Sequence, residues 1–331
     1  MAKRYLVSVA PASAGLFRQE LRQDPGATYV ESLDEWRSFC ELPPEQRYLF
    51  ALHRFEVEFE ARLEKLELEL VASHVADWLK GRDFTGPPFG IQITANLRMD
   101  WSFADLVEAI LLRAGLPREN FAPRQPQRVL SVYLHQRPGE GRIFAGVSSA
   151  EENWSSWSSG QCRIPRDPQS ISRAEAKLIE GWEAFSLPRL AGGLALDLGA
   201  APGGWSRVLS EWGYEVHAVD PAELDPRVLP RVVHHQETAG RFLSRPGPQF
   251  DLLVCDMKME ASKVAEFLLS FRGRLKPRAL LFTTLKLGKG DSGLKEASQA
   301  LEILAGDYSL LAARQLFFNR SEISVALRTW S

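Results

Sequence analysis

The chain has 331 residues, of which 45% are hydrophobic and 25% are charged, and its formal net charge at pH 7 is −2. This length predicts two or three domains, and the composition excludes a disordered or fibrous protein. The near-neutral charge excludes a global electrostatic attraction to nucleic acid, so any contact with RNA has to come from local basic clusters.

Apolar runs and cysteines narrow the class of protein further. No apolar run approaches the roughly 20 residues that span a bilayer, and the first residues enter a strand-like pattern instead of a signal peptide. We therefore expect a cytoplasmic protein with no membrane partner. Cys40, Cys162 and Cys255 are widely spaced and form no Cys-x-x-Cys pair, which predicts reduced thiols, no disulfide framework and no metal site.

The first 150 residues have the pattern of an α+β region. Strands are predicted at 5–9 and 91–97, a helix at 103–114, and paired strands at 129–136 and 142–147. The following stretch is rich in Ser, Trp, Gly and Pro and has no periodicity, which predicts a linker between domains. Its Trp154 and Trp157 are expected to pack on a domain or to present flat faces to nucleic-acid bases.

From residue 192 onward, short apolar runs alternate with helical patterns, which is typical of a doubly wound α/β domain. Strands are predicted at 194–198, 214–219, 231–236, 250–256, 279–285, 310–318 and 323–329, and helices at 206–212, 263–275 and 294–304. The last two strands have no helix between them. We therefore expect an antiparallel hairpin, turned through residues 319–321, at the edge of the sheet.

The first of these strands leads into a glycine-rich loop, Gly199-Ala200-Ala201-Pro202-Gly203-Gly204-Trp205. Glycines allow a tight turn and a close approach of a ligand at the carboxyl end of the strand. A nicotinamide-binding loop is disfavoured, because Ala201 stands where Gly-x-Gly-x-x-Gly requires its second glycine. Asp197 and Asp220 suit the cationic amino-acid part and the ribose hydroxyls of a ligand, respectively, which favours S-adenosylmethionine as the cofactor.

The segment from Asp197 to Ser206 closely resembles the first motif of the FtsJ (RrmJ-like) family of ribose 2′-O-methyltransferases. The resemblance implies a Rossmann-like class I S-adenosylmethionine-dependent methyltransferase domain. That family is known for a Lys-Asp-Lys-Glu tetrad, and candidates for its members occur here in the expected order: Lys177, Asp256, Lys286 and Glu322.

Within the family, the chain is most similar to RlmM-like methyltransferases of 23S ribosomal RNA. This similarity includes Ser172 to Lys177, Cys255-Asp256-Met257, Leu285-Lys286-Leu287 and Gln315-Leu316-Phe317, and it implies a THUMP RNA-binding domain upstream. The expected organisation is an N-terminal α+β (ferredoxin-like) region, a THUMP-like region, a linker and the methyltransferase domain. Their expected bounds are 1–85, 86–150, 151–170 and 171–331.

The resemblance and the strand ends together define the candidate site residues. Cofactor contacts are expected from Asp197, Gly199, Ala200, Pro202, Gly203, Gly204, Trp205, Asp220, Glu237 and Asp256, with Thr238 as an alternative to Glu237 near the adenine. RNA contacts are expected from the local basic residues Arg163, Arg166, Arg173 and Lys289.

The chemistry explains why such a site needs lysines. A ribose 2′-hydroxyl must lose its proton as it attacks the methyl carbon, and a positioned base contributes roughly 10² to 10⁴ in rate. Lys286 is the expected base, Lys177 the neighbouring positive charge, and Asp256 and Glu322 the groups that orient both lysines. A cysteine nucleophile at Cys255 is disfavoured, because a thiol inside an apolar strand is usually buried and inert.

The leading interpretation is methylation of a ribose 2′-hydroxyl of RNA, with 23S ribosomal RNA or a ribosomal precursor particle as the partner. Two alternatives stay open: a non-catalytic RNA-binding or ribosome assembly factor, and a methyltransferase for a small molecule. The tetrad together with the glycine loop favours an active enzyme, and the amino-terminal half favours RNA over a small molecule. The sequence carries no signal for an oligomeric state.

Overall fold

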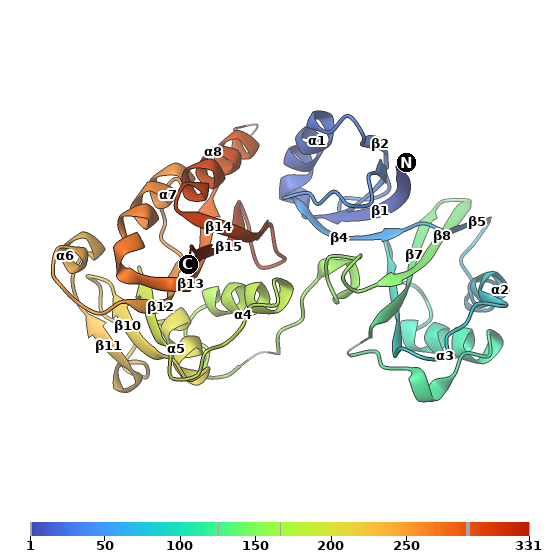
Figure 1. Ribbon diagram of the computed structural model, residues 1–331. Helices are drawn as coiled ribbons and strands as arrows, with labels where there is room; N and C mark the ends of the chain where they lie inside the picture. Colours follow the sequence, from blue (N-terminus) through green and yellow to red (C-terminus); the bar gives the residue numbers. More distant parts are fainter. Residues whose placement is uncertain (1, 125, 166, 289–291, 331) are drawn as a thin grey trace. The chain divides into compact units, whose positions relative to one another are not determined.

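The computed structural model describes residues 2–124, 126–165, 167–288 and 292–330. The chain forms two compact units, Met1–Gln161 and Cys162–Ser331 (Figure 1). Among the described residues, no helix has both the length and the apolar character needed to cross a membrane.

The first unit begins with a four-stranded antiparallel sheet in the order β2-β3-β1-β4. Its elements are β1 (Lys3–Val9), α1 (Ala14–Gln23), β2 (Thr28–Ser32), β3 (Arg37–Leu42) and β4 (Ala51–Glu56). This is the strand arrangement of a ferredoxin-like unit, but residues 43–50 connect β3 to β4 without the second helix. Buried Leu6, Phe39 and Phe55 form its core together with Tyr133 and Phe144 of the neighbouring sheet.

The second sheet of this unit has the order β5-β8-β7-β6 and carries two helices. Its elements are β5 (Phe59–Leu63), α2 (Leu68–Leu79), β6 (Phe89–Ala95), α3 (Phe103–Arg113), β7 (Arg128–Arg137) and β8 (Glu140–Ser149). The structure differs here from the predicted boundary at residue 85. β5 pairs with β8, and α2 contributes Val71 and Val75 to the core of this second sheet, so the first sheet ends at β4.

The predicted linker also differs in its bounds, because residues 151–161 belong to the first unit. The side chain of Trp154 is buried, and the guanidinium of Arg54 lies 4.3 Å from the centre of its ring. The backbone of Asn153 accepts a hydrogen bond from the N–H of Arg54, and Ser159 accepts one from the side chain of Arg37. Trp154 therefore packs in the unit and does not present a free face to a base.

The second unit confirms the predicted doubly wound α/β fold. Its seven strands have the order β11-β10-β9-β12-β13-β15-β14. They are β9 (Leu194–Leu198), β10 (Glu215–Val219), β11 (Val232–His235), β12 (Phe250–Cys255), β13 (Leu275–Lys286), β14 (Tyr308–Arg314) and β15 (Glu322–Thr329). Strands β9 to β13 are parallel, whereas β15 is antiparallel to β13 and to β14. The predicted antiparallel hairpin at the sheet edge is thus confirmed, with residues 315–321 as its connection.

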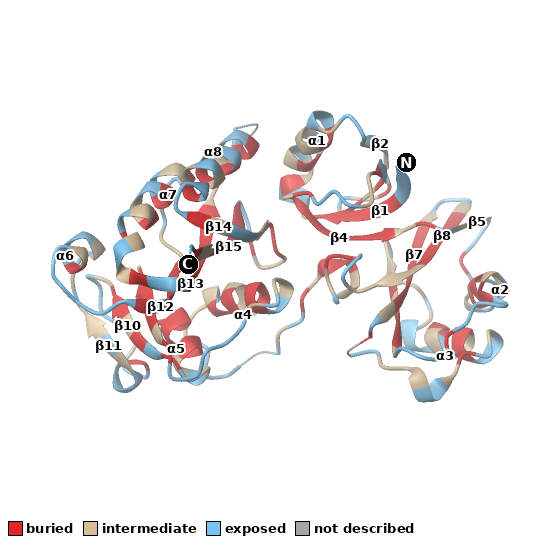
Figure 2. Ribbon diagram, viewed as in Figure 1, coloured by how far each residue is buried: buried red, intermediate tan, exposed pale blue. Residues whose placement is uncertain are grey.

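Helices cover both faces of this sheet (Figure 1). They are α4 (Ala174–Ala184), α5 (Gly204–Glu211), α6 (Ala239–Leu243), α7 (Ala261–Ser270) and α8 (Gly293–Ala305). Leu178 and Trp182 of α4 pack with Val208 of α5 against Val254 and Phe282 of the sheet. Figure 2 shows the central strands coloured as buried along most of their length. Polar groups needed for chemistry are therefore confined to the strand ends.

Candidate active site

The glycine-rich loop joins β9 to α5 in a conformation that requires glycine. Gly199 and Gly203 have φ of +75° and +107°, values that side chains with a Cβ rarely adopt. A Cβ at Gly199 would also lie 2.4 Å from Cγ of Met257. Gly203 ends the loop as the residue before the first helical residue of α5. The positive φ at both positions lets the chain turn tightly at the carboxyl end of β9, the end at which open α/β sheets bind ligands.

The two predicted carboxylates of the cofactor site lie in different environments. Asp220 follows β10, is partly exposed, and accepts hydrogen bonds from the N–H groups of Ala201 (3.1 Å) and Ala222 (2.8 Å). Asp197 is only 2% exposed and accepts a hydrogen bond of 2.7 Å from Oγ of Ser206. Burial raises the pKa of Asp197 to about 7, while the bond from Ser206 opposes this shift. Asp220 is thus partly accessible and binds the loop backbone, whereas Asp197 holds the start of α5.

The structure brings the four predicted tetrad residues together. Nζ of Lys177 lies 2.6 Å from Oε1 of Glu322 and 3.4 Å from Oδ2 of Asp256. Nζ of Lys286 contacts Oδ1 of Asp256 and Oε2 of Glu322. Each carboxylate therefore binds both ammonium groups with different oxygens. Both lysine side chains are about one-fifth exposed, at 17% and 22%, so the cluster is largely shielded but reachable.

Strand pairing explains why three of these side chains meet. Lys286 ends β13 and is the direct cross-strand partner of Glu322, which begins β15. Asp256 follows β12, the parallel neighbour of β13 on its other side. The carboxyl ends of parallel strands share one sheet edge, and the antiparallel β15 starts at that same edge. The register thus places one cation between two anions.

Thr284 is a fifth member of the cluster that the sequence analysis missed. Its fully buried hydroxyl donates to Oδ1 of Asp256 and accepts a hydrogen bond of 2.8 Å from Nζ of Lys286. Thr284 stands two residues before Lys286 in β13, so both side chains point to the same face of the sheet. That alternation is the signal by which Thr284 could have been found.

Lys177 reaches the cluster from α4, which is fixed to α5 by polar contacts. Buried Glu175 accepts hydrogen bonds from the N–H of Ile171 (2.6 Å) and of Ser172 (3.3 Å), and its other oxygen lies 2.5 Å from Nη2 of Arg207. Nε1 of Trp205 donates to the carbonyl of Ala174 at 2.7 Å. These contacts set the first turn of α4, from which Lys177 projects.

The connection before Glu322 is held from the same helix. Both oxygens of Glu180 accept hydrogen bonds of 2.8 Å, from the N–H groups of Phe317 and Phe318. Burial raises the pKa of Glu180 to about 7, and the two N–H donors oppose the shift. Within the turn, Oδ1 of Asn319 accepts from the N–H of Leu316 at 2.8 Å. Helix α4 therefore positions two members of the tetrad, Lys177 directly and Glu322 through this turn.

The charge state of Lys286 follows from its surroundings. Burial lowers its pKa, but the nearby carboxylates of Asp256 and Glu322 outweigh burial and leave the pKa above its ordinary value of 10.5. Lys286 is thus an ammonium at neutral pH. Only the small fraction of Lys286 that is neutral can accept a proton.

Other predicted residues lie outside this cluster. Glu237 pairs with Arg245, and Nε of Arg241 lies 3.6 Å from its carboxylate, whereas Thr238 caps α6 through its hydroxyl. The Trp205 side chain is buried against Phe282, so its ring packs in the core and does not face the loop.

The described structure contains two of the four predicted RNA-contact residues. Arg163 and Arg173 are exposed, and Arg166 and Lys289 lie outside the described residues. Cys40, Cys162 and Cys255 are free and buried; burial was predicted for Cys255 alone, and it raises the pKa of the Cys255 thiol to about 12. A thiolate nucleophile at Cys255 is therefore excluded.

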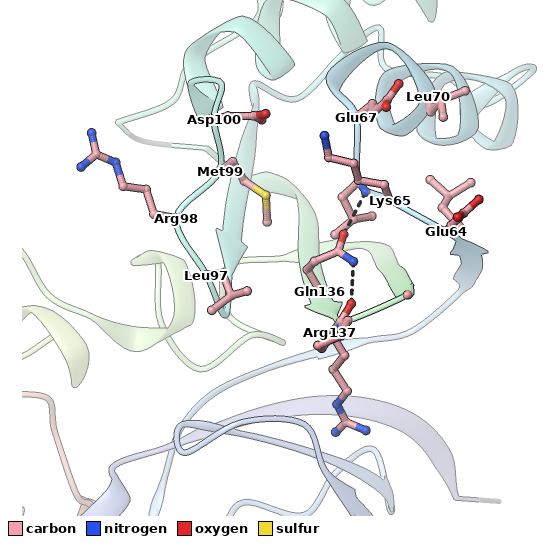
Figure 3. A pocket seen from close by; sticks show the side chains of 14 residues that line it. Glu64, Lys65, Glu67, Leu70, Leu97, Arg98, Met99, Asp100, Gln136 and Arg137 are labelled. Atoms are coloured by element: carbon pink, nitrogen blue, oxygen red, sulfur yellow. Dashed lines mark hydrogen bonds between the residues drawn. The ribbon is translucent and has the colours of Figure 1, made fainter.

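A separate cavity of about 870 Å³ lies in the first unit, beside β5, α2 and the β7–β8 turn (Figure 3). The side chain of Gln136 lies in the wall of this cavity. It accepts a hydrogen bond from the N–H of Leu66 at 2.9 Å and donates one to the carbonyl of Arg137 at 2.8 Å. The basic and acidic side chains that line it are equal in number: Lys65, Arg98 and Arg137 against Glu64, Glu67 and Asp100. This balance gives the cavity no net attraction for a phosphate backbone.

Comparisons with known proteins agree with the site in the second unit. Residues 170–319 match the family model of FtsJ-like methyltransferases. The chain is 33% identical over 238 residues to ribosomal RNA large subunit methyltransferase M of Laribacter hongkongensis, covering 68% of this chain and 64% of that protein. The protein of the same name from Halorhodospira halophila is 33% identical over 223 residues, with 66% and 62% covered.

A third relative of that name, from Sodalis glossinidius, is 32% identical over 234 residues, and the match covers 63% of each chain. The chain thus spans a little under two thirds of the length of these relatives. The family match contains the glycine loop and three tetrad positions, Lys177, Asp256 and Lys286, and it ends just before Glu322. The carboxy-terminal unit of this chain belongs to the FtsJ-like methyltransferase family.

Proposed function

We propose that this chain transfers a methyl group from S-adenosylmethionine to a ribose 2′-hydroxyl of large-subunit ribosomal RNA. The observation that carries the proposal is the cluster of Lys177, Asp256, Lys286 and Glu322, which lies at the strand ends beside the glycine loop. The name shared by the three relatives supports ribosomal RNA as the substrate.

The residues of the glycine loop fit the proposed cofactor. Gly199 and Gly203 give the loop positive φ values that side chains with a Cβ rarely adopt, and the carboxylate of Asp220 is an acceptor for ribose hydroxyls. S-adenosylmethionine, when bound, supplies an electrophilic methyl carbon on a sulfonium. We assign its adenosine part to the loop and Asp220, and keep Glu237 as the candidate for the adenine contact.

The tetrad then handles the proton of the hydroxyl. As the ribose oxygen forms its bond to the methyl carbon and the carbon–sulfur bond breaks, the hydroxyl proton passes to the neutral amine of Lys286. Asp256 and Glu322 keep that amine in place, because each contacts its Nζ. Lys177 adds positive charge close to the oxygen that loses its proton. The hydroxyl of Thr284 donates a hydrogen bond to Asp256 and so holds its carboxylate in place.

RNA would be held by groups at the margin of this unit and by the first unit. Arg163 and Arg173 are exposed and precede or begin α4, the helix that carries Lys177. Arginine binds phosphate oxygens through a planar pair of N–H donors. We propose that the first unit, which contains the predicted THUMP-like region, is a further RNA-binding module. The alternative function, a non-catalytic assembly factor, is one outcome of the test below.

The test is methyl transfer from radiolabelled S-adenosylmethionine to ribosomal RNA from cells that lack this protein. Wild type is compared with Lys286→Ala and with the matched control Lys276→Ala, at the opposite end of the same strand. We expect label in products that resist alkaline cleavage, lost in Lys286→Ala and kept in Lys276→Ala. Cofactor binding without any transfer to RNA or to ribosomal particles would instead support the assembly factor or another substrate.

A further inference from the structure

A second cavity of the carboxy-terminal unit adjoins the tetrad. It has a volume of about 460 Å³ and lies beyond the ends of β12 and β13, between the start of α7 and the first half of α8. Lys286 lines this cavity as well as binding Asp256 and Glu322. Any molecule that fills the cavity therefore contacts Lys286, the residue proposed as the base.

The walls of this cavity combine an apolar side with polar groups. Leu287 and Ala261 are buried and Met259 is half-buried, and these three residues supply apolar lining. Polar lining comes from Lys258 in the connection between β12 and α7, from Ser262 in α7 and from Gln299 in α8. This mixture suits a planar heterocycle with hydrogen-bonding edges.

Some of the polar side chains that line this cavity already bind other groups of the chain. Glu296 is occupied, since its oxygens accept hydrogen bonds of 2.6 Å from the N–H of Gly288 and the hydroxyl of Ser292. Glu260 pairs with Lys263 at 2.7 Å. Within the described part of the chain, the side chains of Lys258, Ser262 and Gln299 have no hydrogen-bond or ion-pair partner. These three side chains are thus available to a ligand, and together they carry one positive charge, that of Lys258.

We propose that this cavity binds the target nucleotide of the RNA in an unpaired conformation, with Gln299 and Ser262 contacting the edge of its base. The inference rests on the proposed function, because it assigns the place from which the ribose meets Lys286. The volume admits one nucleoside and excludes a duplex, so the nucleotide must be single-stranded or rotated out of its helix. Lys258 is the cation for the adjoining phosphate.

The identity of Gln299 makes it the specificity-determining residue of this cavity. Its amide carries a donor and an acceptor side by side, which can pair with the two neighbouring polar groups of a base edge. Gln299 lies three residues after Glu296 on the same face of α8, and Glu296 fixes the loop at Gly288 opposite. The helix therefore presents the amide into a cavity whose other side is held in place.

The first experiment separates binding from catalysis by mapping contacts directly. Full-length protein and unmodified large-subunit ribosomal RNA are irradiated with ultraviolet light, and the crosslinked peptides are identified by mass spectrometry. Crosslinks at Lys258 or Met259, reduced in the cavity-filling variant Ser262→Phe, support the inference even if no methyl transfer is found. Crosslinks confined to other parts of the chain overturn it, even if the RNA is methylated.

The second experiment uses steady-state methylation of the same RNA. In Gln299→Ala we expect the KM for RNA to rise about tenfold, with kcat and the Kd for S-adenosylmethionine changed by less than about twofold. Ser298→Ala, an exposed neighbour on α8 outside the cavity, is the matched control and keeps the wild-type KM. An unchanged KM in Gln299→Ala would overturn the assignment of Gln299. A lower kcat together with a lower melting temperature would also overturn it, because the substitution would then act on the fold.

Discussion

Oε1 of Glu322 lies 2.6 Å from Nζ of Lys177, while its other oxygen contacts Nζ of Lys286. One carboxylate on β15 thus joins a lysine from α4 to a lysine from β13. The only other group among the described residues that contacts both ammonium groups is Asp256. The arrangement of the site therefore depends on Glu322 as much as on the lysines.

Replacing Glu322 should change both the rate and its pH dependence. In Glu322→Gln we expect kcat to fall by about ten- to a hundredfold, because the two lysines lose a shared anion that orients them. Since Glu322 raises the pKa of Lys286, the pH profile of the remaining activity should shift to lower pH. Methylation rates measured over a range of pH test this, and a fall in rate without an acid shift would contradict it.

Lys286→Arg separates charge from basicity. Arginine keeps a positive charge for Asp256 and Glu322, but its guanidinium does not lose a proton in the accessible pH range. We expect methyl transfer to fall by at least about a hundredfold while the melting temperature stays near that of wild type. Lys276→Arg serves as the control, because Lys276 binds Asp251 at the far end of the strand. Substantial activity in Lys286→Arg would show that Lys286 acts through charge alone.

The wild-type rate should rise with pH, because only the neutral amine of Lys286 accepts a proton. Its pKa lies above the ordinary value of 10.5, so the neutral fraction increases about tenfold for each pH unit throughout the range in which the protein stays folded. We expect single-turnover methylation rates to increase from about pH 7 to about pH 9 without a plateau. A plateau near neutrality would contradict Lys286 as the base in this environment.

The glycine loop offers a matched pair of glycine substitutions. Gly199→Ala places a Cβ 2.4 Å from Met257 at a φ of +75°, so we expect a loss of about 1–2 kcal/mol or more in unfolding free energy and weaker cofactor binding. Gly240→Ala in α6 meets nothing within 4 Å and should be neutral or slightly stabilising. Urea unfolding and calorimetric titration with S-adenosylmethionine distinguish the two, and equal effects would contradict the argument.

Two histidines on neighbouring strands should make stability fall in acid. Nδ1 of His217 lies 2.9 Å from Nε2 of His235, and the rings stack with their centres 5.1 Å apart. Burial lowers the pKa of both, and their mutual repulsion lowers that of His235 further. Because the folded pKa values lie below the unfolded ones, this pair contributes stability above about pH 6.5 that is lost as pH falls.

The variant His217→Phe removes one titrating ring from this pair. We expect its unfolding free energy, measured with urea, to fall less between about pH 7 and about pH 5 than that of wild type. An unchanged slope in His217→Phe would mean that other groups dominate the acid response.

Local pattern was sufficient for much of the fold. Apolar alternation located β9 at its observed bounds, and turn residues and helical spacing placed α3 and α8 within one residue of theirs. The glycines of the loop marked a strand end where the backbone turns with positive φ. Periodicity and special backbone conformations are properties of neighbouring residues, so a sequence contains them directly.

The sequence determined the chemistry of the site, namely two lysines and two carboxylates at strand ends, through its motifs. Only the tertiary structure decided which atoms meet: β5 pairs with the distant β8, Thr284 joins the cluster, Glu180 holds the turn before Glu322, and Asp197 turns inward to Ser206. Each of these depends on strand register and helix packing between segments far apart in the chain. Such contacts form only when loop closure brings the segments together, and no local pattern specifies them.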